Sequence, residues 1–589
     1  MWRVVLCLFT LFFVGRALLL FLEKPEAKGK LTYTELTIYS FSLGYAILTI
    51  IGVILAEIGL LVTPINFVAI IILPAFGICF WIYRKIKHSS QHTDSLSYEN
   101  QQNQEQQISN RIMGFFSNIR LSHIIILLVF AIGITLRLES QLTVQWLGDR
   151  DPYYHLSFID SIIIQGTLPS RTFWGLYSYP PSFHVVFATL ISTIQVDRYL
   201  FLKIVPEFLG FLCVPAVYAL TKREYSEWAG VASAAFLAIC SIHIYRTNIA
   251  IPEPIALLGM IMFFHALKTQ TGTKKLILAG FFASIVFLTN VIGILYFLPS
   301  VVGIFIAMLF LKRYRDALEY LKATLVGIMF SGIFWIPILY KMGLSGILDG
   351  LGPSYQSGGV FSFNSSTYFS WIGWGACILG LLGLYISFRN FRKSLFLLIP
   401  TGFYLFLIEA ANNGYLLFDS SVLFRSLLFL GTWISLLAGV GFQRITQIKR
   451  KKISLIILGV LVILTMISFP ILSGTRYPVN WGYENEDFVY RSYFENYVDI
   501  FKDEDSTIYV ANIGFNFGAF SNVVINNEVP QIGEALDAND IPTLLSLINQ
   551  YKINYMILYN GTKEAEFLLK SNLTDIYYED WHTIVLSIK

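Results

Sequence analysis

The chain has 589 residues, of which 55% are hydrophobic and only 14% are charged, and its mean hydropathy is +0.62. A soluble globular protein of this length does not need so much apolar sequence, so the composition excludes that class. The net charge of +4 gives no sign of a nucleic-acid partner, and none is expected. The five cysteines lie in apolar stretches without a CxxC pair, so a disulfide framework is not expected.

Three apolar runs open the chain, at residues 4–21, 36–62 and 66–83, and each is close to the ~20 residues that cross a bilayer. The first run has no clear cleavage site, so we expect a retained span, with a signal peptide as the alternative. Basic residues follow the first run, at 24–30, and the third, at 84–87. The positive-inside rule then places the N-terminus outside the cell.

Residues 88–118 interrupt this apolar pattern, and their glutamine-rich tract at 101–107 cannot bury a core. We interpret them as a cytoplasmic linker. It would join an N-terminal three-span membrane unit, residues 1–87, to a multi-span catalytic core at residues 119–472.

The core is predicted to begin with an outward span at 121–138, which leaves residues 139–198 as an outer loop. One alternation of inside and outside then places every later basic cluster in the cytoplasm and gives about fourteen spans for the whole chain. The later spans are expected at 199–220, 228–246, 254–268, 276–290, 292–311, 322–340, 369–388, 394–409, 422–442 and 453–472.

Residues 473–589 follow the last span and are soluble in character. Short strands are predicted at 507–511, 523–525 and 555–559, and residues 541–551 have helical periodicity. We therefore expect a small extracytoplasmic α/β domain. The chain would be a multi-pass protein of the cell membrane, with its N-terminus and this C-terminal domain outside.

The first outer loop contains an acidic and aromatic motif. Asp149 and Asp151 lie two residues apart, and Tyr153, Tyr154 and His155 follow. Carboxylates suit a hard divalent cation such as Mg²⁺ or Mn²⁺, and histidine tolerates the softer of the two. Such a cation could hold a phosphate leaving group, or a carboxylate could act as a base on an acceptor. The alternative is a polar loop that only caps a helix end.

Two segments of this loop resemble known families of membrane glycosyltransferases. The segment Asp-Pro-Tyr-Tyr-His, which begins at Asp151, resembles one in the catalytic subunits of oligosaccharyltransferases. The segment Tyr-Pro-Pro-Ser-Phe-His, from Tyr179 to His184, resembles the Tyr-Pro-Pro-x-x-His segment of the wider GT-C superfamily. The resemblance implies an α-helical polytopic membrane protein with a GT-C-like fold. It implies a catalytic role for Asp151 and, in a DxD-like pair, for Asp149. The aromatic and histidine residues implied to line the substrate loop are Tyr153, Tyr154, Tyr179 and His184.

A second acidic position follows a turn that contains Arg246. Glu253 lies between two prolines, where the oligosaccharyltransferase family has an acidic motif after an arginine-containing turn. The resemblance implies that Glu253 binds a divalent metal together with Asp151 and His155, and that Arg246 faces the donor phosphate. The alternative is an ordinary helix start, because an acid and a proline both suit a first helical turn.

Arg425 is expected near the outer end of a late span, where an arginine can bind a phosphate with two hydrogen bonds. The resembled family has an arginine beside a phenylalanine near the donor phosphates. The alternative is an arginine that reaches the membrane interface or pairs with Glu409. Residues 341–368 form a glycine-rich segment that includes Tyr355, and we expect it to close over a substrate.

Two motifs that the sequence lacks bear on the acceptor and on the donor. The tail lacks the Trp-Trp-Asp-Tyr-Gly motif of oligosaccharyltransferases, so the acceptor stays open between protein, glycan and lipid. No nucleotide-binding motif is found either, which favours a lipid-linked sugar donor.

We therefore expect transfer of a sugar or oligosaccharide from a polyprenyl-(pyro)phosphate to an acceptor on the outer face, with a divalent metal. The alternatives are a transporter or flippase of lipid-linked glycans and a non-catalytic membrane scaffold. A flippase would need ionisable residues near mid-bilayer or repeated halves, and no internal repeat is found.

Overall fold

The computed structural model describes residues 1–22, 31–57, 120–143, 150–168, 179–349, 365–412, 420–448, 451–468, 507–510 and most of 535–588, with a few isolated positions besides. Several predictions from the sequence fall outside these residues: the span at 66–83, the polar linker, Asp149, Tyr355 and the strand at 523–525. For Asp151, Tyr153 and Tyr154 the structure describes the backbone but not the side chains.

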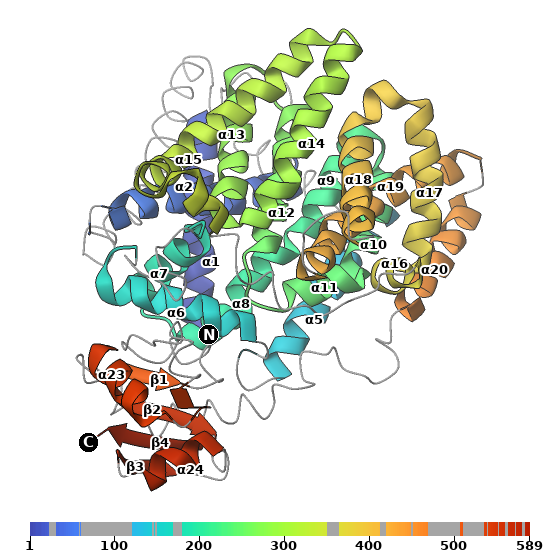
Figure 1. Cartoon of the computed structure of the whole chain (residues 1–589). Coiled ribbons are helices and arrows are strands. Elements are labelled where there is room, and N and C mark those ends of the chain that lie inside the picture. The colour runs from blue at the N-terminus through green and yellow to red at the C-terminus, as the bar shows by residue number, and fades with distance from the viewer. Residues whose placement is uncertain are drawn as a thin grey trace, which may run out of the picture.

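The described chain up to residue 468 is a bundle of helices, as Figure 1 shows. The first half of the bundle comprises α1 (Trp2–Leu22), α2 (Tyr33–Glu57), α5 (Leu121–Thr143), α6 (Arg150–Gln165), α7 (Ser182–Ile194), α8 (Arg198–Phe211), α9 (Cys213–Glu224), α10 (Glu227–Ile239), α11 (Ser241–Thr247) and α12 (Glu253–Thr269). The second half comprises α13 (Gly272–Thr289), α14 (Val291–Phe310), α15 (Tyr314–Asp349), α16 (Ser365–Ile372), α17 (Trp374–Arg389), α18 (Phe391–Asn412), α19 (Ser420–Ile448) and α20 (Lys451–Ser468).

These helices have the composition that a bilayer requires, because a helix satisfies its own backbone groups where no water can. Among the described residues, nine helices are long and apolar enough to cross a membrane, or ten if the bent pair α10–α11 is one span. Large apolar side chains on the outside of the bundle would face lipid; on α5 they are Ile124, Leu127, Leu128 and Ile132.

The structure differs from the prediction at two of the predicted spans and at one predicted loop. The segment predicted as one span at 228–246 is α10 and α11, with a bend of 62° between them. The segment predicted at 369–388 is two helices, α16 and α17, which are separated at Gly373, where φ is +101°. A left-handed backbone favours glycine and interrupts a helix, so hydropathy alone merged the two. The predicted loop at 341–368 begins as helix, since α15 runs on to Asp349 through a kink at Gly343.

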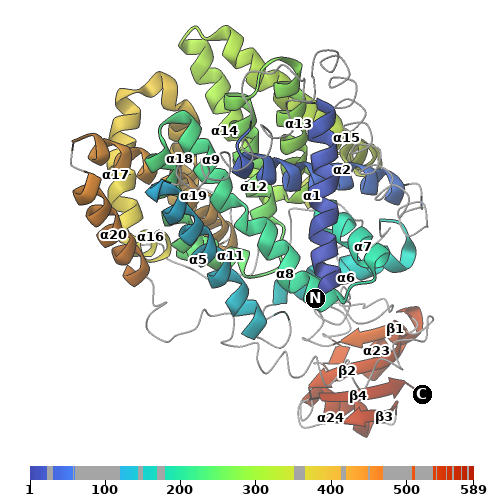
Figure 2. The same ribbon diagram turned by 180° about the vertical axis from the view of Figure 1, so that it is seen from behind.

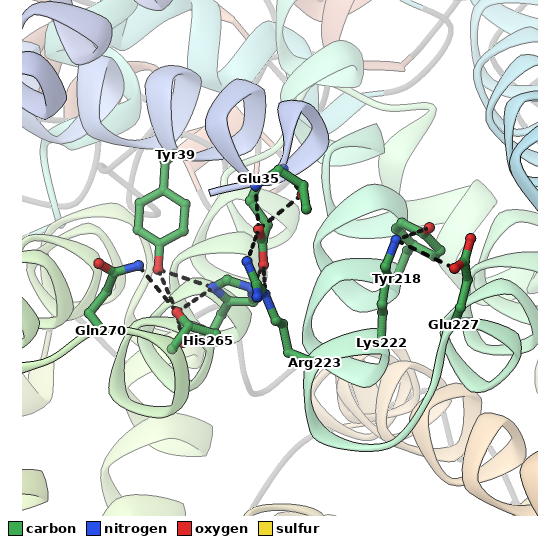
Figure 3. A network of polar contacts seen from close by, with 10 residues as sticks. Glu35, Tyr39, Tyr218, Lys222, Arg223, Glu227, His265 and Gln270 are labelled. Atoms are coloured by element: carbon green, nitrogen blue, oxygen red, sulfur yellow. Dashed lines mark hydrogen bonds and ion pairs between the residues drawn. The ribbon is translucent and has the colours of Figure 1, made fainter. Parts of the chain in front are cut away.

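The second N-terminal helix, α2, is largely buried in the bundle. Glu35 of α2 is 2% exposed and receives two hydrogen bonds from Arg223 of α9, at 2.5 and 2.6 Å. His265 of α12 lies between Glu35, at 3.2 Å, and the hydroxyl of Tyr39, at 3.0 Å (Figure 3). This buried network ties α2 to two core helices. The predicted boundary between the N-terminal unit and the core stays a prediction.

The C-terminal residues form a small α/β unit, as predicted. Its sheet has the strand order β1-β2-β4-β3, with β1 parallel to β2 and the other two pairs antiparallel. The buried residues Leu544, Met556, Leu568 and Leu586 form its core. Its elements are β1 (Thr507–Val510), α23 (Ile541–Tyr551), β2 (Ile553–Tyr559), α24 (Lys563–Lys570), β3 (Thr574–Glu579) and β4 (Thr583–Ile588). Figures 1 and 2 place this unit beyond the end of the bundle where α6 and the N-terminus lie. We call this end the α6 end.

We expect the substitution Arg223→Leu to destabilise the protein by about 1.5–3 kcal/mol, because it removes charged hydrogen bonds from the buried Glu35. Thermal unfolding in detergent measures this. Lys570→Ala is the control, because it removes an exposed ion pair with Glu566 and should change stability by less than about 1 kcal/mol. Equal unfolding temperatures for the two variants would contradict the buried network.

Candidate functional site

Three charged side chains from separate helices meet at the start of α12. Arg246 of α11 donates from Nη2 to Oε1 of Glu253 at 2.9 Å. Arg425 of α19 places its Nε 3.3 Å from the same oxygen. Arg246 and Glu253 are only 5% and 3% exposed. We call Arg246, Glu253 and Arg425 the arginine–glutamate cluster.

The local sequence explains how Glu253 comes to lie here. Pro252 precedes α12 and Pro254 occupies its first turn, so the helix begins at Glu253. A carboxylate at this position interacts favourably with the positive end of the helix dipole. The backbone of Glu253 thus forms an ordinary helix start. Its side chain in addition contacts Arg246 and Arg425.

The arginine–glutamate cluster carries an excess of positive charge. Two guanidinium groups share one carboxylate, which leaves a net charge of +1. Among the described residues, Nε of Arg246 and Oε2 of Glu253 are buried and have no hydrogen-bond partner. A buried polar atom without a partner is costly, so these two atoms are suited to a ligand. An anion with several oxygen acceptors matches the free donor and the net charge.

The two motifs of the first outer loop come together beside this cluster. Nδ1 of His155 lies 2.9 Å from Nε2 of His184, although the residues are 29 positions apart. The ring of Tyr179 lies 5.9 Å from that of His155. His155 is also close enough to Glu253 to interact with it electrostatically. The structure thus brings His155, His184 and Tyr179 together, with Glu253 within electrostatic range of His155.

Asn290 belongs to this group but was not singled out from the sequence. Its Nδ2 donates to the hydroxyl of Tyr179 at 2.9 Å, and its Oδ1 accepts from the backbone N–H of Gly293. Asn290 caps α14 at the junction with α13. In the sequence, an asparagine between two apolar runs indicates only an ordinary helix cap. Its hydrogen bond to Tyr179 depends on the fold and has no local signature.

The helix α6 is anchored by an ion pair that the sequence did not predict. Arg198, at the start of α8, lies 2.5 Å from a carboxylate oxygen of Asp160. Burial raises the pKa of Asp160 to about 6, against the opposing effect of Arg198. Asp151 lies in the first turn of the same helix, one turn from His155, so both residues occupy one face of α6. The ion pair therefore anchors the helix whose first turn contains Asp151.

A metal site is not complete within the described side chains. No group of three or more histidine, cysteine, aspartate or glutamate residues among them could hold an ion. Glu253 and His155 are described, whereas the carboxylates of Asp149 and Asp151 are not. Glu253 still offers Oε2 as an oxygen donor, while its Oε1 is already paired with arginine.

Comparison with known proteins supports the resemblance. The profile of the dolichyl-phosphate-mannose-protein mannosyltransferase family matches residues 171–341, which include Tyr179, Arg246 and Glu253. Dolichyl-phosphooligosaccharide-protein glycotransferase 1 of Pyrococcus furiosus is 24% identical over 147 residues, 23% of this chain and 15% of the relative. Glycotransferase 2 of Archaeoglobus fulgidus is 22% identical over 174 residues, 27% of this chain and 29% of the relative. The matches thus span less than a third of either curated relative.

Two solved structures share the arrangement of the helices. The apo oligosaccharyltransferase of Archaeoglobus fulgidus superimposes with a TM-score of 0.54 at 12% identity, over 80% of this chain and 74% of that one. ArnT from Cupriavidus metallidurans, bound to undecaprenyl phosphate, superimposes with a TM-score of 0.58 at 11% identity, over 78% and 97%. The chain is a multi-pass membrane protein with the GT-C fold of membrane glycosyltransferases, as its two loop motifs indicated.

We expect Gly210→Ala to introduce steric clashes next to the arginine–glutamate cluster. A Cβ at Gly210 of α8 would lie 2.8 Å from Cγ2 of Thr247 and 3.1 Å from Cβ of Pro254, the neighbours of Arg246 and Glu253. Overpacking of this kind costs about 1–3 kcal/mol, which thermal unfolding would detect. Gly402→Ala is the control, because a Cβ there meets nothing within 4 Å. If both variants unfold at the wild-type temperature, the close approach of α8 to the site is wrong.

Proposed function

We propose that the chain is a membrane glycosyltransferase that takes a sugar or oligosaccharide from a polyprenyl-(pyro)phosphate and transfers it to an acceptor at the α6 end of the bundle. The observation that carries this proposal is the arginine–glutamate cluster, with its net positive charge and its free Nε of Arg246. The relatives that match are named as glycosyltransferases, which supports transfer over the flippase and scaffold alternatives.

In this proposal Arg246 and Arg425 bind the donor phosphate, and Glu253 holds the two guanidinium groups in place. A guanidinium presents donors in one plane and matches the oxygens of a phosphate. The lipid tail would stay in the bilayer while the phosphate reaches the end of α12. As the sugar leaves, charge grows on the phosphate, and fixed positive groups stabilise that charge.

Asp151 would act on the acceptor, either as a base or as a ligand of a metal that activates it, with Asp149 beside it. Its position one helical turn before His155 places it on the face of α6 whose histidine contacts His184. Tyr153, Tyr154, Tyr179 and Tyr355 would complete the substrate loop. The acceptor stays open between protein, glycan and lipid.

A divalent ion such as Mn²⁺ or Mg²⁺ fits the described residues in part. Oε2 of Glu253 is a buried oxygen without a partner among them, which suits an ion, but two arginines already neutralise that carboxylate. Asp151, His155 and Glu253 would hold the ion, and it would supply positive charge to the departing phosphate. The outer face of the cell membrane is the proposed location of the site.

Transfer by the purified protein tests the proposal. Radiolabelled polyprenyl-phosphate sugar and polyprenyl-pyrophosphate oligosaccharide are each supplied with a sequon peptide or with a membrane glycan extract, in Mn²⁺ or in EDTA. We expect label to move to one acceptor fraction, and Arg246→Leu to lower transfer. Labelled peptide would indicate a protein acceptor, and labelled glycan or lipid the other class. No transfer from either donor in Mn²⁺ would refute the proposal. Equal rates in Mn²⁺ and in EDTA would show that transfer does not require a divalent metal.

We expect Asp151→Ala to abolish transfer while expression and binding of the lipid donor persist, because Asp151 acts on the acceptor and not on the phosphate. Asp197→Ala is the matched control: Asp197 lies in the same outer loop and caps α8, so its loss costs about 1 kcal/mol of stability but leaves transfer intact. A wild-type transfer rate in Asp151→Ala would rule out this role.

A further inference from the structure

Arg137 is a charged residue inside a predicted span and has no role in the site described above. It lies on α5 within the apolar stretch Leu121–Glu139, and it is 0% exposed. Other side chains of α5, among them Leu128 and Ile132, are exposed and would face lipid. A charged side chain in a bilayer is expensive and usually serves a function. The contacts of Arg137 show what that function is.

The guanidinium of Arg137 reaches across to α10 and α11. Its Nη1 donates to the backbone oxygens of Gly133, at 2.6 Å, and of Ala238, at 3.1 Å. Its Nη2 lies 2.6 Å from Nδ1 of His243 and 3.5 Å from the oxygen of Leu237. Because a guanidinium can only donate, Nδ1 of His243 must accept, and His243 carries its proton on Nε2.

These contacts lie on both sides of the break between α10 and α11. Ala238 is in the last turn of α10, Cys240 has an extended backbone, and α11 then departs at 62°. The last carbonyls of a helix lack partners within it, and the negative end of its dipole attracts a cation. Arg137 supplies both needs for α10, and through His243 it also holds the first turn of α11.

The segment that Arg137 holds carries a residue of the proposed donor site. Arg246 follows His243 by three residues in α11, about one helical turn away. With seven residues α11 is far too short to be stable by itself, so its contacts decide its direction. The hydroxyl of Thr247 donates to the backbone oxygen of His243 at 2.6 Å, which keeps this turn rigid.

A buried acidic residue, Glu207, lies within electrostatic range of Arg137. It lies on α8, is 1% exposed and interacts electrostatically with both Arg137 and Lys203. Neither of its carboxylate oxygens has a hydrogen-bond partner among the described residues. The described hydrogen bonds of Arg137 to other helices therefore go to α10 and α11, and none goes to Glu207.

We propose that Arg137 is a positioning residue: through His243 it sets the angle between α10 and α11, and thereby brings Arg246 to Glu253 and Arg425. This inference rests on the proposed function, in which Arg246 binds the phosphate of a lipid. Arg137 itself touches no ligand.

Binding of undecaprenyl phosphate to the full-length protein in nanodiscs tests this role, with the unfolding temperature recorded for each variant. Substituting Arg137 also changes the charges around the buried Glu207, so variants of His243 carry the test. His243→Leu removes the acceptor of a charged hydrogen bond, and we expect the dissociation constant to rise at least about tenfold. His243→Asn keeps an acceptor near the position of Nδ1, and we expect it to bind within about threefold of wild type.

Two controls separate positioning from general destabilisation and from failure of the proposed function. Arg223→Leu removes the partner of the buried Glu35 at the far end of α9 and should lower the unfolding temperature while binding stays unchanged. Arg246→Leu should lose binding. If it does, and His243→Leu binds like wild type, the positioning role alone is wrong. Equal loss of binding in Arg223→Leu and His243→Leu would also overturn it. If Arg246→Leu binds like wild type, both the positioning role and the phosphate site are wrong.

Discussion

One buried carboxylate organises the functional end of this protein. Oε1 of Glu253 contacts both Arg246 and Arg425, so α11, α12 and α19 converge on a single oxygen atom. Each of these charges would be costly at the end of an apolar bundle, and each is tolerated because of the others. Their sum is positive, so the pairing that stabilises the fold also leaves capacity for an anion. In the proposed function the same contact would serve both stability and ligand recognition.

The surrounding helices are shaped to permit this contact. The break of 62° after α10 turns Arg246 inward, and Gly210 lets α8 approach Thr247 and Pro254 closely. About twelve residues further along α12, roughly 18 Å, His265 joins α2 and α9 through Glu35 (Figure 3). The helix α12 is thus held by charged contacts near both of its ends, while its middle is buried and carries apolar side chains.

The parts of the site that the sequence predicted are those with local signatures. The two motifs were recognised within one predicted loop, and in the structure His155 and His184 meet; the GT-C fold that the motifs indicated is confirmed. Hydropathy located the helices, because burial in a bilayer depends on composition over a whole segment. The catalytic and metal roles of Asp149 and Asp151 stay predictions.

The parts that were missed depend on spatial neighbours far apart in sequence. Glu409 was the partner considered for Arg425, whereas the ion pair of Arg425 with Glu253, 172 residues before it in the chain, was not foreseen. Nothing local distinguishes Asn290 from an ordinary cap, or Arg137 from an arginine that reaches the interface. The breaks at Cys240 and Gly373 were also hidden, because hydropathy averages over a window and is blind to one residue of extended or left-handed backbone.

The central claim is that the arginine–glutamate cluster binds the phosphate of a lipid. A cryo-electron microscopy map of the protein in nanodiscs with undecaprenyl phosphate tests this claim directly. The account predicts density for the phosphate within hydrogen-bond distance of Nε of Arg246 and of the Arg425 guanidinium, with the lipid chain leading into the bilayer. Phosphate density elsewhere on the bundle, with the two arginines still paired to Glu253 and without phosphate, would contradict it.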